Sequence, residues 1–594
     1  MKPLLNTASN LATLSCCFMI LFAPALRAQQ ERNPFAQNVL DEYVPKEAVF
    51  GAKAMVVCAH PEAARVGADI LKRGGNAVDA AVAMQFALAV VFPVAGNIGG
   101  GGFMVLRLAN GKTVTLDFRE AAPKLASRDM FLDSAGNVVP ELSTHGHKAS
   151  GVPGAVAGMA EAHKKYGKLA WKNLVQPAID LARRGVVLTK REAVGLHHLN
   201  DFLPKFNPGK QYFVKTSGTW SAGDTLVQED LAQTFERIRD KGRSGFYDGK
   251  TAELLVAEMK AGGGIISRED LKTYRAKWRK PLIGSYRGHT VITMAPPSAG
   301  GVGLLQLLKM LEPFPLREWG WNTDKTAHCM IEAERRVYAD RAEYLGDPDF
   351  YDVPIGQLLN TRYNAARMAS FKPDTITPST AITFGKDVRS FKSSEQTTHF
   401  SIVDASGNAV AVTTTLNGAY GSKVVVGGAG FLLNNEMDDF SVKPGAPNMF
   451  GAIGGEANAI QPRKRMLSSM TPTIIEKPVS DKKGAKKQLF MVVGTPGGTT
   501  ITTSVLQGIL NVIDHNMTMQ QAVNARRFHH QYVPDIVRIE NGTFTDDVKA
   551  ALQRKGHTLR QPSPIGKLDC IMRLTDGRLE GAADPRGDDA AAGF

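Results

Sequence analysis

Cysteine is scarce in this sequence, with five in 594 residues, and two of the five lie in the N-terminal segment. The other three are Cys58, Cys329 and Cys570, and no Cys-x-x-Cys pair occurs. Three cysteines cannot form a disulfide framework, so the fold has to depend on a hydrophobic core, which a chain of this length can supply. Cys58 ends a short apolar run, which predicts a buried packing role for it and not a reactive thiol.

Long apolar runs are also missing. The apolar stretch at residues 11–25 is too short and too poorly flanked to span a membrane. It follows Lys2 and precedes a small-residue motif that ends at Ala28, which is typical of a secretory signal peptide covering residues 1–28. Because no later stretch reaches about 18 apolar residues, we expect a soluble, exported mature protein, in the periplasm or secreted. A lipid anchor on one of the two early cysteines is an alternative that the surrounding residues fit poorly.

Signatures of nucleic-acid and nucleotide binding are absent as well. The formal net charge is +14, but Lys and Arg are scattered, and the one dense run, at residues 481–487, has no interleaved aromatics. We interpret that run as a solvated surface loop. The glycine-rich segment Gly494–Gly498 lacks the lysine of a phosphate loop, and no dinucleotide-binding glycine pattern occurs. The sequence therefore predicts no cofactor, no metal and no nucleic-acid partner.

What the sequence does contain is a series of apolar helices and strands. The predicted elements are a strand at 54–58, helices at 61–73 and 76–91, strands at 103–106 and 114–118, a mainly helical region at 150–395, a hairpin of strands at 398–403 and 409–415, a strand at 489–493 and a helix to about 513. Strands packed against buried helices on both sides indicate a layered α/β fold.

Two segments contain groups that could perform acyl transfer. The turn Gly494–Gly498 joins a strand to a helix, so the N–H groups of Gly497 and Gly498 could stabilise an oxyanion; a tight packing turn is the alternative. Thr397 stands just before the predicted hairpin. If the chain were cut before it, its own α-amine could act as the base that activates its hydroxyl. On local pattern alone, Thr397 is the beginning of a strand.

The run Thr397-Thr-His-Phe-Ser-Ile-Val-Asp404 closely resembles the small-subunit N-terminus of the γ-glutamyltransferases, also called γ-glutamyl transpeptidases. Further matches occur in the same order along nearly the whole chain after the signal peptide. They are the glycines at 99–102, Asp117-Phe-Arg-Glu120, Thr415-Leu-Asn417, Leu433-Asn-Asn-Glu-Met-Asp-Asp-Phe440, Arg465-Met-Leu-Ser-Ser-Met470 and Gly494-Thr-Pro-Gly-Gly498.

The resemblance implies a four-layer αββα fold of the N-terminal-nucleophile hydrolases, of the α/β (α+β) class. It also implies self-cleavage between Gln396 and Thr397. The large subunit would cover residues 29–396 and the small subunit residues 397–594, and the two would remain together as a heterodimer.

The resemblance also implies roles for individual residues. Thr397 would be the nucleophile, oriented by the Thr415 hydroxyl, with Gly497 and Gly498 as the oxyanion donors. The γ-glutamyl substrate has a zwitterionic α-amino-acid end, which the remaining residues would bind. Its α-carboxylate would be held by Arg119, Ser468 and Ser469, and its α-ammonium by Asn417, Glu436 and Asp439. The expected donor is glutathione or a related γ-glutamyl compound, and the acceptor is water, an amino acid or a dipeptide.

Two positions depart from familiar bacterial members of the family. Glu436 stands where some have Gln, and its charge should strengthen amine binding. Residues 444–459 resemble a lid loop, in which Phe450 replaces a Tyr that often reaches the residue equivalent to Asn417. Phe450 has no hydroxyl, so we expect a lid that closes by packing alone and opens more easily.

Two other functions stay open from the sequence. One is an acylase that removes a glutaryl-type side chain by the same chemistry, although a glutaryl group has no amine for Asn417, Glu436 and Asp439. The other is an inactive binding protein for γ-glutamyl compounds, against which the intact Thr397 and Thr415 argue. A single band of precursor size on a denaturing gel would favour the binding protein.

Overall fold

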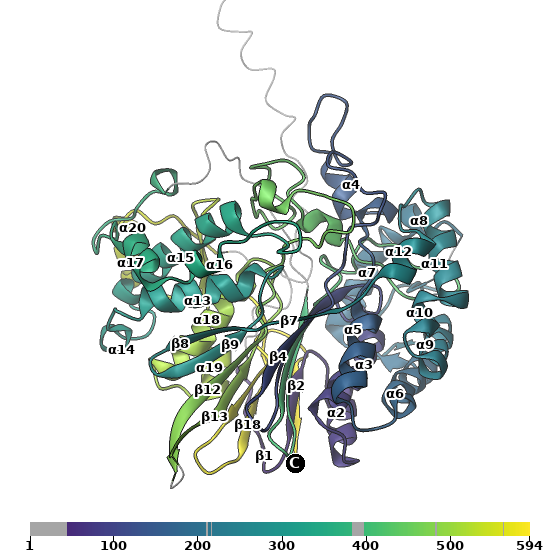
Figure 1. The fold of residues 1–594 in the computed structure, drawn as a ribbon, viewed down its shortest axis with the longest axis horizontal. Helices are drawn as coiled ribbons and strands as arrows, with labels where there is room; N and C mark the ends of the chain where they lie inside the picture. Colours follow the sequence, from purple (N-terminus) through teal and green to yellow (C-terminus); the bar gives the residue numbers. More distant parts are fainter. Residues whose placement is uncertain (1–43, 210–211, 216, 383–396, 482–483, 562–563) are drawn as a thin grey trace, which may run out of the picture.

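The computed structural model describes residues 44–594 except 210–211, 216, 383–396, 482–483 and 562–563 (Figure 1). The predicted signal peptide and Gln396, on the near side of the predicted cleavage point, lie outside the described residues. The three remaining cysteines are all buried and unpaired, which confirms the packing role predicted for Cys58.

Two antiparallel seven-stranded sheets form the centre of the molecule (Figure 1). The first sheet has the order β19 (Ala590–Gly593), β2 (Met55–Cys58), β10 (Thr398–Val403), β11 (Ala409–Thr415), β3 (Gly101–Arg107), β4 (Thr113–Asp117) and β7 (Lys277–Arg279). The second has the order β1 (Val49–Gly51), β18 (Leu579–Ala582), β17 (Cys570–Arg573), β13 (Gly484–Val493), β12 (Thr473–Asp481), β9 (His289–Thr293) and β8 (Leu282–Tyr286).

Successive side chains of the central strands enter two different cores, because side chains alternate between the faces of a sheet. Val56 and Val412 belong to the core beneath the helices of the first sheet. Val57 and Ala411, one residue along, belong to the core that also contains Val492 of the second sheet. The first sheet is therefore covered on both faces, which explains why every residue of β2, β10 and β11 is buried.

Helices cover the outer face of each sheet and complete four layers (Figure 1). Over the first sheet lie α2 (Pro61–Lys72), α3 (Ala77–Val91) and α5 (Ala155–Tyr166), and over the second lie α13 (Ala299–Leu311), α15 (Asp324–Tyr344), α18 (Thr500–Ile513) and α19 (Met519–Asn524). This αββα arrangement confirms the predicted fold.

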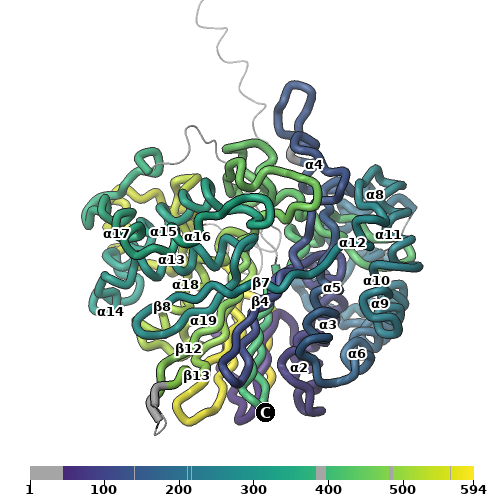
Figure 2. The backbone as a smooth tube through the Cα atoms, in the orientation of Figure 1, coloured from purple at the N-terminus to yellow at the C-terminus, as the bar shows by residue number. Residues whose placement is uncertain are grey.

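The remaining elements surround these layers, as the backbone tube in Figure 2 also shows. The helices are α4 (Pro140–Thr144), α6 (Trp171–Arg184), α7 (Lys190–Asn200), α8 (Leu203–Phe206), α9 (Glu229–Lys241), α10 (Ser244–Tyr247), α11 (Gly249–Ala261), α12 (Arg268–Thr273), α14 (Leu316–Trp319), α16 (Ile355–Leu358), α17 (Thr361–Met368) and α20 (Asp546–Arg554), with the short 3-10 turns η1 (His147–Ala149), η2 (Ser379–Ala381), η3 (Glu436–Asp439) and η4 (Glu456–Asn458). The minor strands are β5 (Val186–Val187), β6 (Thr225–Leu226), β14 (Phe528–His529), β15 (Val537–Ile539) and β16 (Leu559–Arg560).

Local sequence signals account for the elements nearest the centre. The Asn76 side chain accepts from the N–H groups of Val78 and Asp79, and Asp79 accepts in return from the Asn76 N–H, so a capping box begins α3. Every residue of α3 is buried, as its continuous apolar character predicts. At the β10–β11 turn, Asp404 accepts from the backbone N–H groups of Ser406 and Asn408, each over 2.9 Å.

Two parts of the sequence interpretation were incomplete. The region at 150–395, expected to be mainly helical, also contributes β7, β8 and β9 to the two sheets. Strand β8 is a half-exposed edge strand with Gly284 and Ser285 in it, so its apolar signal is weak. The basic run at 481–487 was expected to be a loop, but where it is described it belongs to the β12–β13 hairpin: Asp481 ends β12, and residues 484–487 begin β13. Lys486 and Lys487 are exposed there, because the hairpin extends past the core.

Candidate active site

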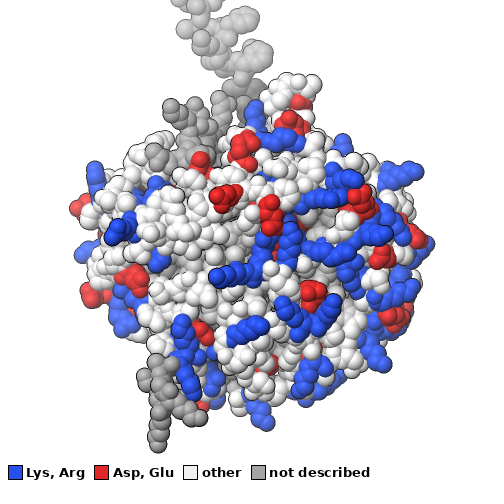
Figure 3. All heavy atoms as spheres, in the orientation of Figure 1, with Lys and Arg blue, Asp and Glu red and all other residues white. Residues whose placement is uncertain are grey.

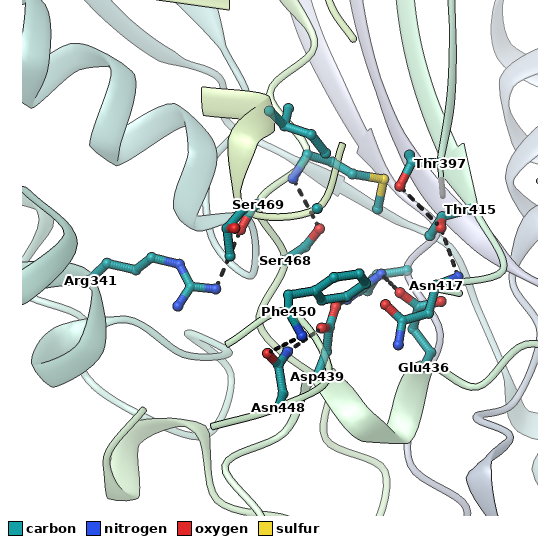
Figure 4. A pocket seen from close by; sticks show the side chains of 15 residues that line it. Arg341, Thr397, Thr415, Asn417, Glu436, Asp439, Asn448, Phe450, Ser468 and Ser469 are labelled. Atoms are coloured by element: carbon teal, nitrogen blue, oxygen red, sulfur yellow. Dashed lines mark hydrogen bonds and ion pairs between the residues drawn. The ribbon is translucent and has the colours of Figure 1, made fainter. Parts of the chain in front are cut away.

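Thr397 immediately precedes β10, a central strand of the first sheet. Thr398 lies opposite Thr414 in the β10–β11 hairpin, so one further step along both strands brings Thr397 beside Thr415. The two side-chain oxygens are 3.4 Å apart, and the Asn417 N–H donates to Thr415 Oγ1 over 2.7 Å (Figure 4). The Thr415 hydroxyl is therefore held beside Thr397, which is the geometry that its predicted orienting role requires.

Arg119 follows β4 and is almost completely buried. Its guanidinium pairs with the carboxylates of Glu436 and Asp439, which stand at the two ends of η3. It also donates to the carbonyls of Met466, over 3.3 Å, and Leu467, over 3.1 Å. Burial alone would lower the pKa of Arg119, but Glu436 and Asp439 raise it above its ordinary value. The residues predicted to bind the two charged ends of a substrate are paired with one another here.

Glu120 belongs to the same charge cluster, although sequence reasoning assigned it no role. It is fully buried, and one of its oxygens lies 3.8 Å from the Arg119 guanidinium. A Cβ atom on Gly101 would come within 2.7 Å of the Glu120 carboxylate, so the glycine at this position makes room for the acid. Burial raises the pKa of Glu120 to about 7. The only signal in the sequence is its place directly after Arg119.

Replacing Glu120 by Gln should remove a loss of stability that wild type undergoes as pH rises from 4.5 to about 7. The ordinary pKa of a glutamic acid is 4.5, whereas that of Glu120 is raised to about 7. Between these values the folded state keeps a proton that the unfolded state has released, so wild-type stability falls as pH rises through this window. We expect the unfolding temperature of Glu120→Gln, relative to wild type, to increase by about 1–3 °C between pH 5 and pH 8. Differential scanning calorimetry measures this, with the exposed Glu47→Gln as control; a constant difference would contradict it.

Ser468 and Ser469 lie in the segment that leads into β12. The Ser468 N–H donates to the Pro297 carbonyl over 2.9 Å, and the Ser468 carbonyl accepts from Ala299 N–H over 2.6 Å. The glycine- and proline-rich turn at 296–301 thereby fixes the position of the Ser468 backbone. Ser468 Oγ accepts from Met470 N–H over 3.2 Å, and Ser469 Oγ accepts from the guanidinium of Arg341 over 3.3 Å (Figure 4).

The glycine turn lies between β13 and the N-terminus of α18. Gly497 has a φ of 136° and Gly498 a φ of 53°, values that favour glycine. Gly498 lines the pocket, whereas Gly497 is not among the lining residues. Gly494 packs against the ring of His399, because a Cβ on Gly494 would lie 2.1 Å from that ring. The turn therefore needs its glycines for close packing as well as for any oxyanion role.

His399 is a structural histidine, as the sequence interpretation held. It is fully buried, with Nδ1 2.9 Å from Thr413 Oγ1 and Nε2 3.1 Å from Ser401 Oγ. Burial lowers the pKa of His399 to about 3, so the ring is neutral at physiological pH.

The loop at 444–459 closes over these residues. Phe450 is buried and lines the pocket, but packing alone does not hold the loop, so that expectation was wrong. Asn448 Nδ2 donates to Asp439 Oδ1 over 2.9 Å, and Gln531 Nε2 donates to the Phe450 carbonyl over 3.2 Å. Phe450 offers no hydroxyl to Asn417. The neighbouring Met449 thioether accepts from Asn417 Nδ2 over 3.6 Å.

One pocket brings most of the predicted residues together (Figure 4). Its cavity, measured as the space open to the centre of a water molecule, is about 20 Å³, which is room for about one water. A ligand therefore needs the ion pairs or the loop at 444–459 to shift. Its lining comprises Arg119, Arg341, Thr397, Thr415, Asn417, Glu436, Asp439, Asn448, Phe450, Ser468, Ser469, Met470, Gly498, Thr499 and Ile501. Sequence reasoning missed Arg341, which lies in no motif that it used, and Asn448, which lies in the loop at 444–459 but was given no role.

A buried threonine at the beginning of a central strand, between two stacked sheets that helices enclose, defines an N-terminal-nucleophile hydrolase. Within that class, the chain belongs to the gamma-glutamyltranspeptidase family, whose model matches residues 63–594. The resemblance noted in the sequence is thus confirmed.

Three known proteins illustrate the relationship. The glutathione hydrolase proenzyme of Escherichia coli (strain K12) is 46% identical over 548 residues, which cover 92% of this chain and 93% of that protein. The solved structure of Helicobacter pylori gamma-glutamyltranspeptidase is 48% identical with a TM-score of 0.55, covering 57% of this chain and 97% of that one. Cephalosporin acylase from Bacillus halodurans is 27% identical with a TM-score of 0.82, covering 94% of this chain and 99% of that one.

None of the helices in the described part of the chain has the length and apolarity that a membrane crossing needs. Across the same described ranges, no three His, Cys, Asp or Glu side chains are grouped as metal ligands. On the face seen in Figure 3, Lys and Arg side chains lie intermixed with Asp and Glu.

Proposed function

We propose that this protein hydrolyses and transfers γ-glutamyl groups of glutathione and related compounds through a γ-glutamyl ester of Thr397. The observation that supports this most strongly is the charge balance of the pocket. One guanidinium, that of Arg119, pairs with two carboxylates, those of Glu436 and Asp439, so the ionised group of three carries one net negative charge. A zwitterionic α-amino-acid end presents one carboxylate and one ammonium. Its carboxylate can pair with Arg119 and its ammonium with Glu436 and Asp439, so no buried charge is left unpaired.

The reaction has two halves. Thr397 Oγ attacks the γ-carbonyl while the α-amine of Thr397 takes the hydroxyl proton, and the N–H groups of Gly497 and Gly498 receive the developing oxyanion. The amide C–N bond then breaks, and the departing amine takes that proton. Water, or an amino-acid or dipeptide amine, next attacks the ester carbonyl and loses a proton to the α-amine of Thr397. The ester C–O bond then breaks, and that proton passes to Thr397 Oγ, which restores the hydroxyl.

Maturation would use the same hydroxyl. Thr397 Oγ would attack the Gln396 carbonyl in an N-to-O acyl shift, and water would hydrolyse the ester that results. The products would be a large subunit from residue 29 to 396 and a small subunit from residue 397 to 594, joined as a heterodimer because both contribute strands to each sheet. Removal of residues 1–28 would accompany export, with the periplasm as the expected location.

A donor panel tests the function. The purified protein is expected to show two subunit bands on a denaturing gel and to cleave γ-glutamyl-p-nitroanilide and glutathione, with faster nitroaniline release when glycylglycine is added. The matched glutaryl-p-nitroanilide should be a poor substrate, because it has no ammonium to replace the share of Arg119 that Glu436 and Asp439 lose when Arg119 binds the carboxylate of the donor. Preference for the glutaryl donor would instead identify an acylase, and a single inactive band would identify a binding protein.

Introducing a hydroxyl at the lid should change the fate of the ester. Phe450→Tyr is expected to keep the loop closed longer, because the tyrosine hydroxyl can add a hydrogen bond of about 1 kcal/mol near Asn417. Water then reaches the ester more easily than a bulkier acceptor does. We expect the ratio of hydrolysis to transfer to increase at least about twofold, with the exposed Phe350→Tyr as control. An unchanged ratio in steady-state assays with glycylglycine would exclude this role.

A further inference from the structure

Arg341 brings a second guanidinium to the substrate pocket. It lies near the end of α15 and reaches Ser469 from the side away from Thr397 (Figure 4). Among the described residues, its guanidinium makes one hydrogen bond, from a terminal nitrogen to Ser469 Oγ over 3.3 Å. Its Nε atom is buried and has no hydrogen-bond partner among the described residues. The side chain is therefore aimed at the pocket with most of its donors unused.

Arg119, by contrast, has little capacity left for a ligand. A guanidinium has five N–H donors. In Arg119, four of them serve the Glu436 and Asp439 carboxylates and the carbonyls of Met466 and Leu467. To hold a ligand carboxylate with two parallel hydrogen bonds, Arg119 would have to release at least one of these partners.

The charges around Arg341 also favour the binding of a ligand carboxylate at this residue. Among the described residues, no carboxylate forms an ion pair with Arg341; the nearby Asp439 already accepts from Arg119 and from Asn448. A buried guanidinium without an anionic partner is unfavourable. An incoming carboxylate would remove that cost, so binding energy is available at this point of the pocket.

We propose that Arg341 is a specificity-determining residue that binds the α-carboxylate of the donor together with Ser469. This inference rests on the proposed function. Because Ser469 Oγ accepts from Arg341, the Ser469 hydroxyl proton is directed elsewhere and can be donated to the ligand. The carboxylate then lies between Arg119 and Arg341, and Arg119 can retain part of its bonding to Glu436 and Asp439.

The experiment compares two donors that differ only in this carboxylate, γ-glutamyl-p-nitroanilide and 4-aminobutyryl-p-nitroanilide. For Arg341→Gln, we expect KM for the γ-glutamyl donor to increase by about tenfold to a hundredfold, the range of a lost charge-assisted bidentate contact. The kcat should stay within about threefold, because the reacting atoms are not touched. For the donor without the carboxylate, wild type and variant should have equal kcat/KM. Arg341→Lys should recover only part of the loss, since it restores charge without the planar fork.

Controls separate the possible results. Arg362→Gln, an exposed arginine of α17, should behave as wild type, and subunit bands with an unchanged unfolding temperature show that each variant is folded. Equal losses on both donors would mean a structural role and overturn the proposal. So would an unchanged KM for γ-glutamyl-p-nitroanilide, or an increase confined to the KM of glycylglycine, which would assign Arg341 to the acceptor. If wild type cleaves neither donor, the proposed function itself fails.

Discussion

Thr397→Ala should leave a single chain that is neither cut nor active. The variant keeps the backbone of β10 but loses the hydroxyl that lies 3.4 Å from Thr415 Oγ1. Because one hydroxyl is proposed to act in both maturation and catalysis, its removal stops both. We expect nitroaniline release from γ-glutamyl-p-nitroanilide to fall by at least about 10⁴-fold, the scale of losing a catalytic nucleophile, and mass spectrometry to find the bond between residues 396 and 397 intact.

Two further variants make this result specific. Thr397→Ser keeps a hydroxyl and should still mature and retain part of the activity, whereas Thr219→Ala, on the exposed surface, should change neither. Cleavage of Thr397→Ala at the normal position, or full activity of wild-type protein whose 396–397 bond is intact, would be incompatible with the proposed mechanism.

Asp439→Asn should separate γ-glutamyl donors from glutaryl donors. The substitution preserves shape but removes the negative charge that pairs with Arg119 and accepts from Asn448. The ammonium of a γ-glutamyl donor then loses an anionic partner in a buried site, which costs about 2–5 kcal/mol. We expect kcat/KM for γ-glutamyl-p-nitroanilide to fall by about 10²- to 10³-fold.

The matched glutaryl-p-nitroanilide has no amine and should change by less than about threefold. Asp576→Asn, at an exposed turn, serves as control for the loss of one charge. Equal losses on the two donors would indicate that Asp439 supports the pocket and does not bind the ammonium. An unfolding temperature close to that of wild type is needed in each case, because Arg119 loses an ion-pair partner in the variant.

Elements with strong local signals were predicted well. The continuous apolar run after Asn76 predicted α3. Alternation predicted β10, and β-branched and apolar residues predicted β11, both with the bounds that the structure has. In contrast, β8 and β9 were not predicted. Strand β8 is an edge strand that contains Gly284 and Ser285, and its sequence shows no clear period of two. Burial of these strands depends on β12, which pairs with β9 and lies far along the chain.

The site residues also divide into contacts set by local sequence and contacts between distant segments. The pairing of Thr397 with Thr415 follows from the register of a local hairpin. The contact between Arg119 and Glu436 joins residues separated by 317 positions, and no local pattern encodes it. The family resemblance supplied the roles of these residues, but it did not indicate that four of the five Arg119 donors already serve protein acceptors, nor that Glu120 and Arg341 share its surroundings.

By itself the sequence determined the apolar helices, the central hairpin and the kinds of chemical group available, because those depend on neighbours within a few residues. The tertiary structure decided which charges face one another, which of them are paired before a ligand arrives, and how tightly the loop at 444–459 closes. These are properties of packing between distant segments. Burial in that packing raises the pKa of Glu120 and leaves Arg341 with donors to spare, and neither effect exists until the four layers have assembled.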